Sequence, residues 1–250
     1  MKKDSPLKAK PLRQAGQSVQ EELDRLLGDE LVDYALVPIF LLVVALYEWT
    51  RWWLEAPPQP VPMTVAALLA LAYCVPKTLQ IRRRARLLKQ GRDGEKVVGE
   101  YLERLRETGC VIFHDILADT FNVDHVVLSE KGLFVIETKT FSKARGARVH
   151  SDGTQLTVDG LGDQTSIIDQ ALGNSRWVRE MLRESTGRTY PTKPVVVFPG
   201  WYVEGGLHKD FWVISPKALP KLLEGENQKI AHEDVKLAAF HLSRFVRASA

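Results

Sequence analysis

The apolar positions of this chain fall into two patterns. Residues 31–53 and 56–76 are long apolar runs, and the second contains no charged residue. A membrane-spanning helix needs about 20 mainly apolar residues, so each run is long enough for one span. From residue 91 onward, helical spacing alternates with short β-branched runs, which predicts an α/β domain. The expected organisation is a polar tail with a short helix at 1–30, two transmembrane helices at 31–79, a basic juxtamembrane linker at 80–90 and the α/β domain at 91–250.

The charges beside the apolar runs predict their orientation. Basic residues precede the first run and follow the second, whereas the connection between the runs holds only Arg51 against Glu48 and Glu55. The positive-inside rule then places both flanks in the cytoplasm. The alternative is a helical hairpin buried in a soluble protein, with the arginines on a solvated face. The basic residues concerned are Lys2, Lys3, Lys8, Lys10 and Arg13 on one side and Arg82, Arg83, Arg84, Arg86 and Lys89 on the other.

Residues 91–250 show the periodicity of a mixed α/β domain. An amphipathic helix that ends at Gly109 is followed by several strands, then by helices that cover them. Helices are predicted at 93–108, 163–184, 216–223 and 233–246, strands at 111–117, 123–128, 133–136, 194–198 and 211–214, and a more polar hairpin at 145–158.

Two of these strands form a hairpin that brings three polar groups together. With a turn between Leu128 and Leu133, backward pairing places Asp124 opposite Glu137 on one face of the sheet. Lys139, two residues further on, shares that face. Apolar residues on both faces elsewhere predict a covered sheet, and like charges buried there are costly unless a ligand binds between them. A divalent metal ion is the simplest candidate, and a structural cross-strand ion pair is the alternative.

Composition limits the remaining possibilities. Cys74 lies within an apolar run and Cys110 in a different context, so neither a disulfide framework nor a zinc motif is indicated. Residues 1–90 hold 13 Lys and Arg against 9 Asp and Glu, leaving 21 against 22 in residues 91–250. The α/β domain therefore lacks the overall positive charge typical of proteins that bind nucleic acid.

Four short motifs occur in an order that resembles a known family. Together they resemble the nuclease-related domain, NERD, of the PD-(D/E)xK restriction-endonuclease-like superfamily. The usual proline before the aspartate is Val123 here. The motifs are Gly91-x-x-Gly94-Glu95-x-x-Val98, Asn122-Val123-Asp124-His125, Gly132-Leu133-Phe134-Val135-Ile136-Glu137-Thr138-Lys139 and Asp169-Gln170-Ala171-x-x-Asn174.

The resemblance implies a restriction-endonuclease-like core, with a mixed central sheet flanked by helices, and cleavage of nucleic-acid phosphodiesters with Mg²⁺ or Mn²⁺. By position, Asp124 and Glu137 would be metal ligands, with Glu95 as an accessory ligand from the first helix. Lys139 would be the catalytic lysine, and Gln170 would act from the edge of the site. Glu95 could instead stabilise its helix end, and Gln170 could be a surface residue.

Other residues carry weaker expectations. Lys143, Arg145 and Arg148 follow the catalytic strand and could contact phosphates, although a solvated loop explains them equally well. Asn174 is interpreted as structural, and His125 as a histidine packed in the core.

The sequence hypothesis is a nuclease in the cytoplasmic membrane of a bacterium. It would be multi-pass, bound to lipid through residues 31–79, with its C-terminal domain in the cytoplasm cutting DNA rather than RNA. The resemblance also makes a homodimer an expectation. The competing hypothesis is a catalytically silent module that binds nucleic acid or protein at the membrane.

Overall fold

The computed structural model describes residues 12–57, 60–226 and 229–249. The chain divides into two compact units. One unit is Val19–Lys89. The other consists of two parts of the chain, the residues that end at Ser18 and the residues Gln90–Ala250. All four lysines of the predicted basic tail lie outside the described residues, and Arg13 lies within them.

The unit Val19–Lys89 consists of two long helices. α1 spans Gln17–Trp53 and α2 spans Pro60–Glu103, and an ion pair between Arg84 and Glu22 links them. One helical stretch, Met63–Thr108, contains a window long and apolar enough to cross a membrane. Many large apolar side chains on both helices are exposed, among them Leu41, Leu42, Val43 and Leu46 on α1 and Leu68, Leu69 and Leu71 on α2.

Both helices are longer than the pattern predicted. The short helix predicted within residues 1–30 begins at Gln17 and continues without a break into the first apolar run, because Gly28, although a poor helix former, does not end α1. Residues 80–90 are helical as well, so the helix expected to begin at 93 is the last part of α2. It ends in the 3-10 helix η1 (Arg104–Thr108), and Gly109 closes it in the left-handed conformation, as predicted.

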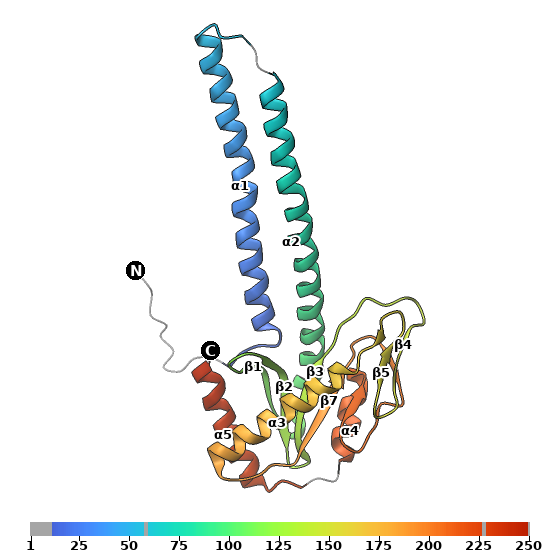
Figure 1. The fold of residues 1–250 in the computed structure, drawn as a ribbon. Coiled ribbons are helices and arrows are strands. Elements are labelled where there is room, and N and C mark those ends of the chain that lie inside the picture. The colour runs from blue at the N-terminus through green and yellow to red at the C-terminus, as the bar shows by residue number, and fades with distance from the viewer. Residues whose placement is uncertain (1–11, 58–59, 227–228, 250) are drawn as a thin grey trace. The chain divides into compact units, whose positions relative to one another are not determined.

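A five-stranded mixed sheet forms the centre of the other unit (Figure 1). Its order is β1-β2-β3-β7-β9; the first three strands are antiparallel, and β3, β7 and β9 are parallel. The expected mixed sheet flanked by helices is therefore confirmed, and it fits a nuclease-like core. The strands are β1 (Val111–Leu117), β2 (Asn122–Ser129), β3 (Gly132–Thr138), β7 (Thr192–Val197) and β9 (Trp212–Ile214).

Helices cover both faces of this sheet. α3 (Ser166–Thr186) and α5 (His232–Ser249) pack on one face through Val178, Leu182 and Leu242. The end of α2 packs on the other through Val98 and Leu102, together with η2 (Pro216–Ala218) and α4 (Leu219–Gly225). Every residue of β3 is buried, which explains why both faces of this strand are apolar.

The β2–β3 hairpin has the predicted register. Leu128 pairs with Leu133, and Ser129 with Gly132, so the turn itself is only Glu130 and Lys131. Gly132 has φ of 139°, a value that L side chains rarely adopt. The pairing that was expected to align the two carboxylates is therefore correct.

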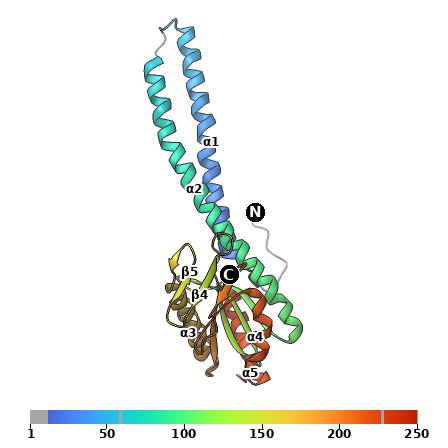
Figure 2. The ribbon, with the colours of Figure 1, turned by 90° about the vertical axis from the view of Figure 1, so that its right-hand side faces the viewer.

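A second, smaller sheet lies beside α3 (Figure 2). The predicted polar hairpin is present as β4 (Arg148–Ser151) and β5 (Leu156–Val158). The strands β6 (Gly162–Asp163) and β8 (Tyr202–Glu204) complete this sheet and were not predicted. α3 begins three residues later than expected, because Asp163 pairs in β6 and its Oδ1 accepts hydrogen bonds from Thr165.

Candidate active site

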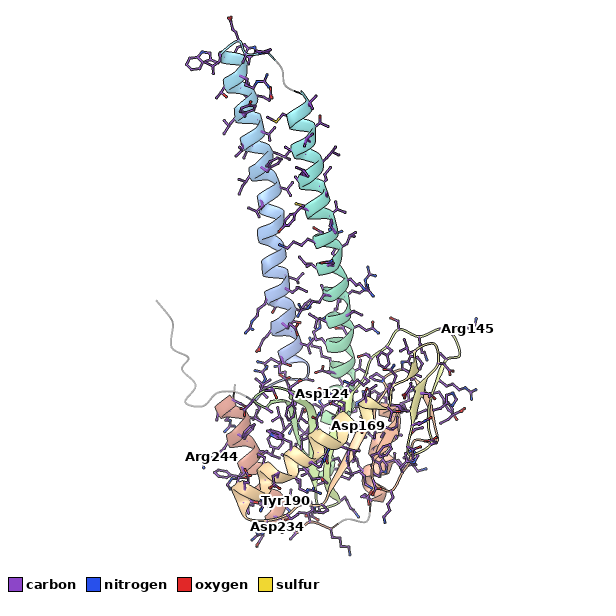
Figure 3. The ribbon with its side chains drawn as sticks, viewed as in Figure 1. Asp124, Arg145, Asp169, Tyr190, Asp234 and Arg244 are labelled. Carbon is purple, nitrogen blue, oxygen red and sulfur yellow. The ribbon has the colours of Figure 1, made fainter. Side chains whose placement is uncertain are left out.

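Three predicted side chains meet at one end of the central sheet. Asp124 on β2 and Glu137 on β3 are both buried, with 6% and 3% of their surface exposed. The backbone N–H of Thr138 donates to Asp124 Oδ2 over 2.7 Å, and Lys139 Nζ lies 2.8 Å from Glu137 Oε1. Figure 3 marks Asp124 at this end of the sheet. The structure thus brings together the two carboxylates and the ammonium group.

Two amides from α3 hold the carboxylate of Glu137. Gln170 Nε2 donates to Oε1 over 2.8 Å, and Asn174 Nδ2 donates to Oε2 over 2.8 Å. Gln170 therefore lies where it was predicted, whereas Asn174 was missed as a site residue. The signal was present, because residues i and i+4 of a helix share one face. Together with Lys139, these amides engage both oxygens of Glu137.

Glu95 reaches the same region from α2. A Cβ on the neighbouring Gly94 would lie 2.5 Å from Cγ2 of Thr140, so only glycine lets α2 approach the chain beyond β3 this closely. Glu95 is buried, and among the described residues its Oε2 has no hydrogen-bond partner. An unpaired buried carboxylate oxygen is costly, and a ligand bound to this atom would relieve that cost.

Burial is the largest cause of the raised pKa values of all three carboxylates. Burial raises the pKa of Glu95 to about 7, and the charges of Asp115 and Glu137 add to this effect. Burial also raises the pKa of Asp124 well above its usual value, with contributions from Glu137 and Glu95. The pKa of Glu137 is raised by burial as well, although Lys139 and Asn174 oppose the shift. A bound cation would favour the charged form of each of these buried carboxylates.

The carboxylates of Asp124, Glu137 and Glu95 suit a hard divalent cation chemically, but they are not arranged as a complete coordination shell. Among the described residues, no group of three or more His, Cys, Asp or Glu side chains is arranged to hold a metal ion. The oxygens of Glu137 contact Lys139 and the amides of α3. Carboxylate oxygens are nevertheless the ligands that Mg²⁺ and Mn²⁺ prefer, and the free Glu95 oxygen fits that role.

The raised pKa of Glu95 makes folding stability depend on pH. Between about pH 4.5 and about pH 7 the folded state binds more protons here than the unfolded state, so without metal the free energy of unfolding falls as pH rises. Glu95→Gln should remove this contribution and flatten the decline. Urea unfolding of both proteins at about pH 5 and about pH 8 measures the difference.

The comparison of wild type with Glu95→Gln controls for other groups that titrate in this pH range. His114 and His125, whose pKa values are lowered by burial, titrate in both proteins and cancel in the difference. Equal pH dependence in wild type and Glu95→Gln would show that Glu95 is not perturbed.

The three predicted phosphate-binding residues lie in different surroundings. Lys143 Nζ donates to the carbonyl oxygen of Gly200 and lies 5.6 Å from the centre of a tryptophan ring. Arg148 pairs with Glu204. Arg145 is exposed in the loop before β4 (Figure 3). The binding of these three residues to nucleic acid stays a prediction.

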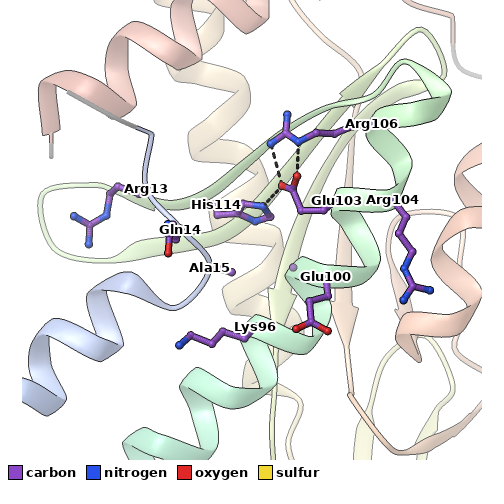
Figure 4. A pocket seen from close by; sticks show the side chains of 10 residues that line it. Arg13, Gln14, Ala15, Lys96, Glu100, Glu103, Arg104, Arg106 and His114 are labelled. Carbon is purple, nitrogen blue, oxygen red and sulfur yellow. Dashed lines mark hydrogen bonds and ion pairs between the residues drawn. The ribbon is translucent and has the colours of Figure 1, made fainter. Parts of the chain in front are cut away.

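A chain of polar groups lies on the opposite face of the sheet. His125 is fully buried, as predicted, and its Nδ1 lies 2.8 Å from Nδ1 of His114. His114 Nε2 lies 2.7 Å from Glu103 Oε1, which also binds Arg106 (Figure 4). Glu103, Arg106 and His114 border a cavity of about 690 Å³ that residues 13–15 also line.

The mixed sheet with its covering helices fits a nuclease-like α/β core. Comparison with family models agrees: a NERD domain, described as "Nuclease-related domain", is found at residues 90–199. An uncharacterised protein of Bacillus anthracis is 30% identical over 79 residues, which cover 30% of this chain and 37% of that protein. The chain thus spans little more than a third of that relative's length. No solved structure matches the chain significantly.

Proposed function

We propose that this protein is a metal-dependent nuclease that hydrolyses phosphodiester bonds of DNA. The observation that carries the proposal is the set of Asp124, Glu137 and Lys139 at one sheet end, inside the segment that matches the NERD domain. A buried acid pair beside a lysine is a costly arrangement for stability alone.

Each side chain of the site would have a separate role in phosphodiester hydrolysis. Asp124, Glu137 and Glu95 would hold Mg²⁺ or Mn²⁺, which when bound acidifies water and offsets developing negative charge. Lys139 is a point charge that can stabilise the phosphoryl oxygens or orient the attacking water. Gln170 and Asn174 fix the carboxylate of Glu137 through its two oxygens, so that it is already oriented before substrate binds.

We further propose that the long helices anchor the domain in the cytoplasmic membrane of a bacterium. Their exposed apolar side chains, such as Leu42 and Leu69, would face lipid rather than water. The arginines that follow the second apolar run then belong on the cytoplasmic side, together with the nuclease domain. A homodimer stays a prediction.

A second candidate is a module that binds nucleic acid or protein without cutting it. The absence of a preformed three-ligand metal group among the described residues favours this candidate, as does the balance of 21 basic and 22 acidic residues after residue 90. It predicts that the carboxylates matter for folding but not for binding.

Cleavage assays on the full chain, purified in detergent, separate the two candidates. Linear, circular, single-stranded and branched DNA, and RNA, would each be incubated with Mg²⁺, Mn²⁺ or EDTA. We expect cleavage of at least one DNA with metal and none with EDTA. Binding without cleavage in every metal condition would favour the silent module, and preferential cleavage of RNA would reassign the substrate.

A further inference from the structure

A short segment before the first long helix is attached to the sheet next to the candidate active site. Asp115, fully buried in β1, accepts a hydrogen bond from Arg13 Nε over 2.6 Å. It also accepts hydrogen bonds from the backbone N–H of Ser18 over 2.9 Å and from the Ser18 hydroxyl over 2.5 Å. Asn122 Nδ2 lies 3.3 Å from both Asp115 Oδ1 and Ser18 Oγ. One buried carboxylate thus holds both ends of residues 13–18.

Asp115, which makes these hydrogen bonds, has a strained backbone conformation. Its φ is 50°, in the left-handed region, although it lies within a β-strand and is not glycine. It follows His114, which pairs with His125, the residue next to Asp124 on β2. Strained positions persist only where their surroundings fix them, and here Arg13 and Ser18 supply that constraint.

Between these two attachments, the segment touches the helix that carries Glu95. The backbone of Gly16 opposes the rise in the pKa of Glu95. Gly16 has φ of 69°, and a Cβ there would lie 3.2 Å from Cγ of Arg92, one turn earlier in α2. Ala15 lies so close to Gly99 that a Cβ on Gly99 would be 2.8 Å from its own. Contacts at both Gly16 and Ala15 therefore fix this part of α2.

We propose that residues 13–18 are a positioning element of the active site, which holds Glu95 in place for metal binding. The proposal rests on the proposed metal-dependent function. It extends the site beyond the NERD match, which begins at residue 90. Arg13 acts through Asp115 and Gly16, and it does not itself touch metal or substrate.

Calorimetric titration of the full chain with Mn²⁺, at neutral pH in detergent, tests this without relying on cleavage. Arg13→Ala should weaken Mn²⁺ binding by about tenfold, as loss of groups that orient metal ligands commonly does. Ser18→Ala, a milder change, should weaken it less. The matched control is Arg188→Ala, which breaks another arginine–aspartate pair, with Asp234, elsewhere in the same unit.

A double-mutant cycle separates positioning from a general effect on folding. If Arg13 acts through Glu95, then Arg13→Ala should cause no further loss of Mn²⁺ affinity in a Glu95→Gln background. Additive losses would overturn the proposal, as would equal losses in Arg13→Ala and Arg188→Ala. If Arg13→Ala does not fold, the same cycle is run with Ser18→Ala.

The outcomes also distinguish this inference from the proposed function. Coupled Mn²⁺ binding without cleavage of any nucleic acid would overturn the nuclease and leave the positioning element standing. Metal-dependent cleavage, together with additive losses of Mn²⁺ affinity in Arg13→Ala and Glu95→Gln, would support the nuclease and overturn the positioning element. A wild-type protein that binds no Mn²⁺ would overturn both.

Discussion

Replacing Glu137 with glutamine should abolish most cleavage while leaving the protein folded. Glutamine keeps the size of the side chain but loses the charge that faces Lys139, 2.8 Å away, and that would bind metal. Removing one preorganised electrostatic group typically costs about 10²–10³-fold in rate, and a weakened metal site adds to this loss. We therefore expect a fall of at least about a hundredfold in single-turnover cleavage of labelled DNA at saturating Mn²⁺.

The lysine gives an independent test of the same prediction. Lys139→Met keeps the aliphatic stem and removes the charge, so it should show a loss of similar size with metal binding largely retained. Lys131→Met is the matched control, because Lys131 lies exposed in the turn at the other end of this hairpin. Cleavage within about twofold of wild type in Glu137→Gln or Lys139→Met would argue against this site as the catalytic centre.

A methyl group on Gly94 should impair the site from a distance. The Cβ of Gly94→Ala would lie 2.5 Å from Cγ2 and 2.6 Å from Oγ1 of Thr140, so α2 or the chain after β3 must move. Glu95, the next residue, would move with the helix. Displacement of a catalytic group by about 1 Å can cost about a hundredfold in rate, and we expect a loss of about 10–100-fold here.

Gly91 supplies the control, since it lies on the same helix and a Cβ there would meet nothing within 4 Å. Gly91→Ala should keep full activity and stabilise the helix by about 0.5–1 kcal/mol. Thr140→Ala, which removes the two crowding atoms, should restore part of the activity of Gly94→Ala. Equal activity in Gly94→Ala and Gly91→Ala would mean that this close contact does not position Glu95. Cleavage rates and thermal midpoints of the four proteins measure both effects.

The sequence predicted the hairpin and its polar end because both depend on local rules. A short turn between β-branched runs fixes the register, and the register fixes which side chains oppose each other. Asp124, Glu137 and Lys139 therefore followed from a stretch of fewer than twenty residues. Gln170 came only from the resemblance, since nothing in an amphipathic helix shows which polar residue turns inward.

What the sequence did not predict depends on contacts between distant parts of the chain. Asn174 has the same helical phase as Gln170, but its hydrogen bond to Glu137 spans 37 positions. Arg13 and Asp115 are 102 positions apart, and neither stands in a recognisable motif. The strands β6 and β8 are too short to leave a periodic pattern. α1 is continuous because helix formation outweighs one tolerated glycine.

The attachment of residues 13–18 also restricts how the chain can meet a membrane. Ser18 and Gln90 belong to one folded unit, so the chain leaves that unit and returns to it. A folded domain lies on one side of a bilayer. The chain between Ser18 and Gln90 must therefore cross a bilayer an even number of times or not at all. If the apolar part of the helix Met63–Thr108 crosses a bilayer, it cannot cross alone, and α1 must cross as well. This parity follows from connectivity, independently of where the basic residues lie.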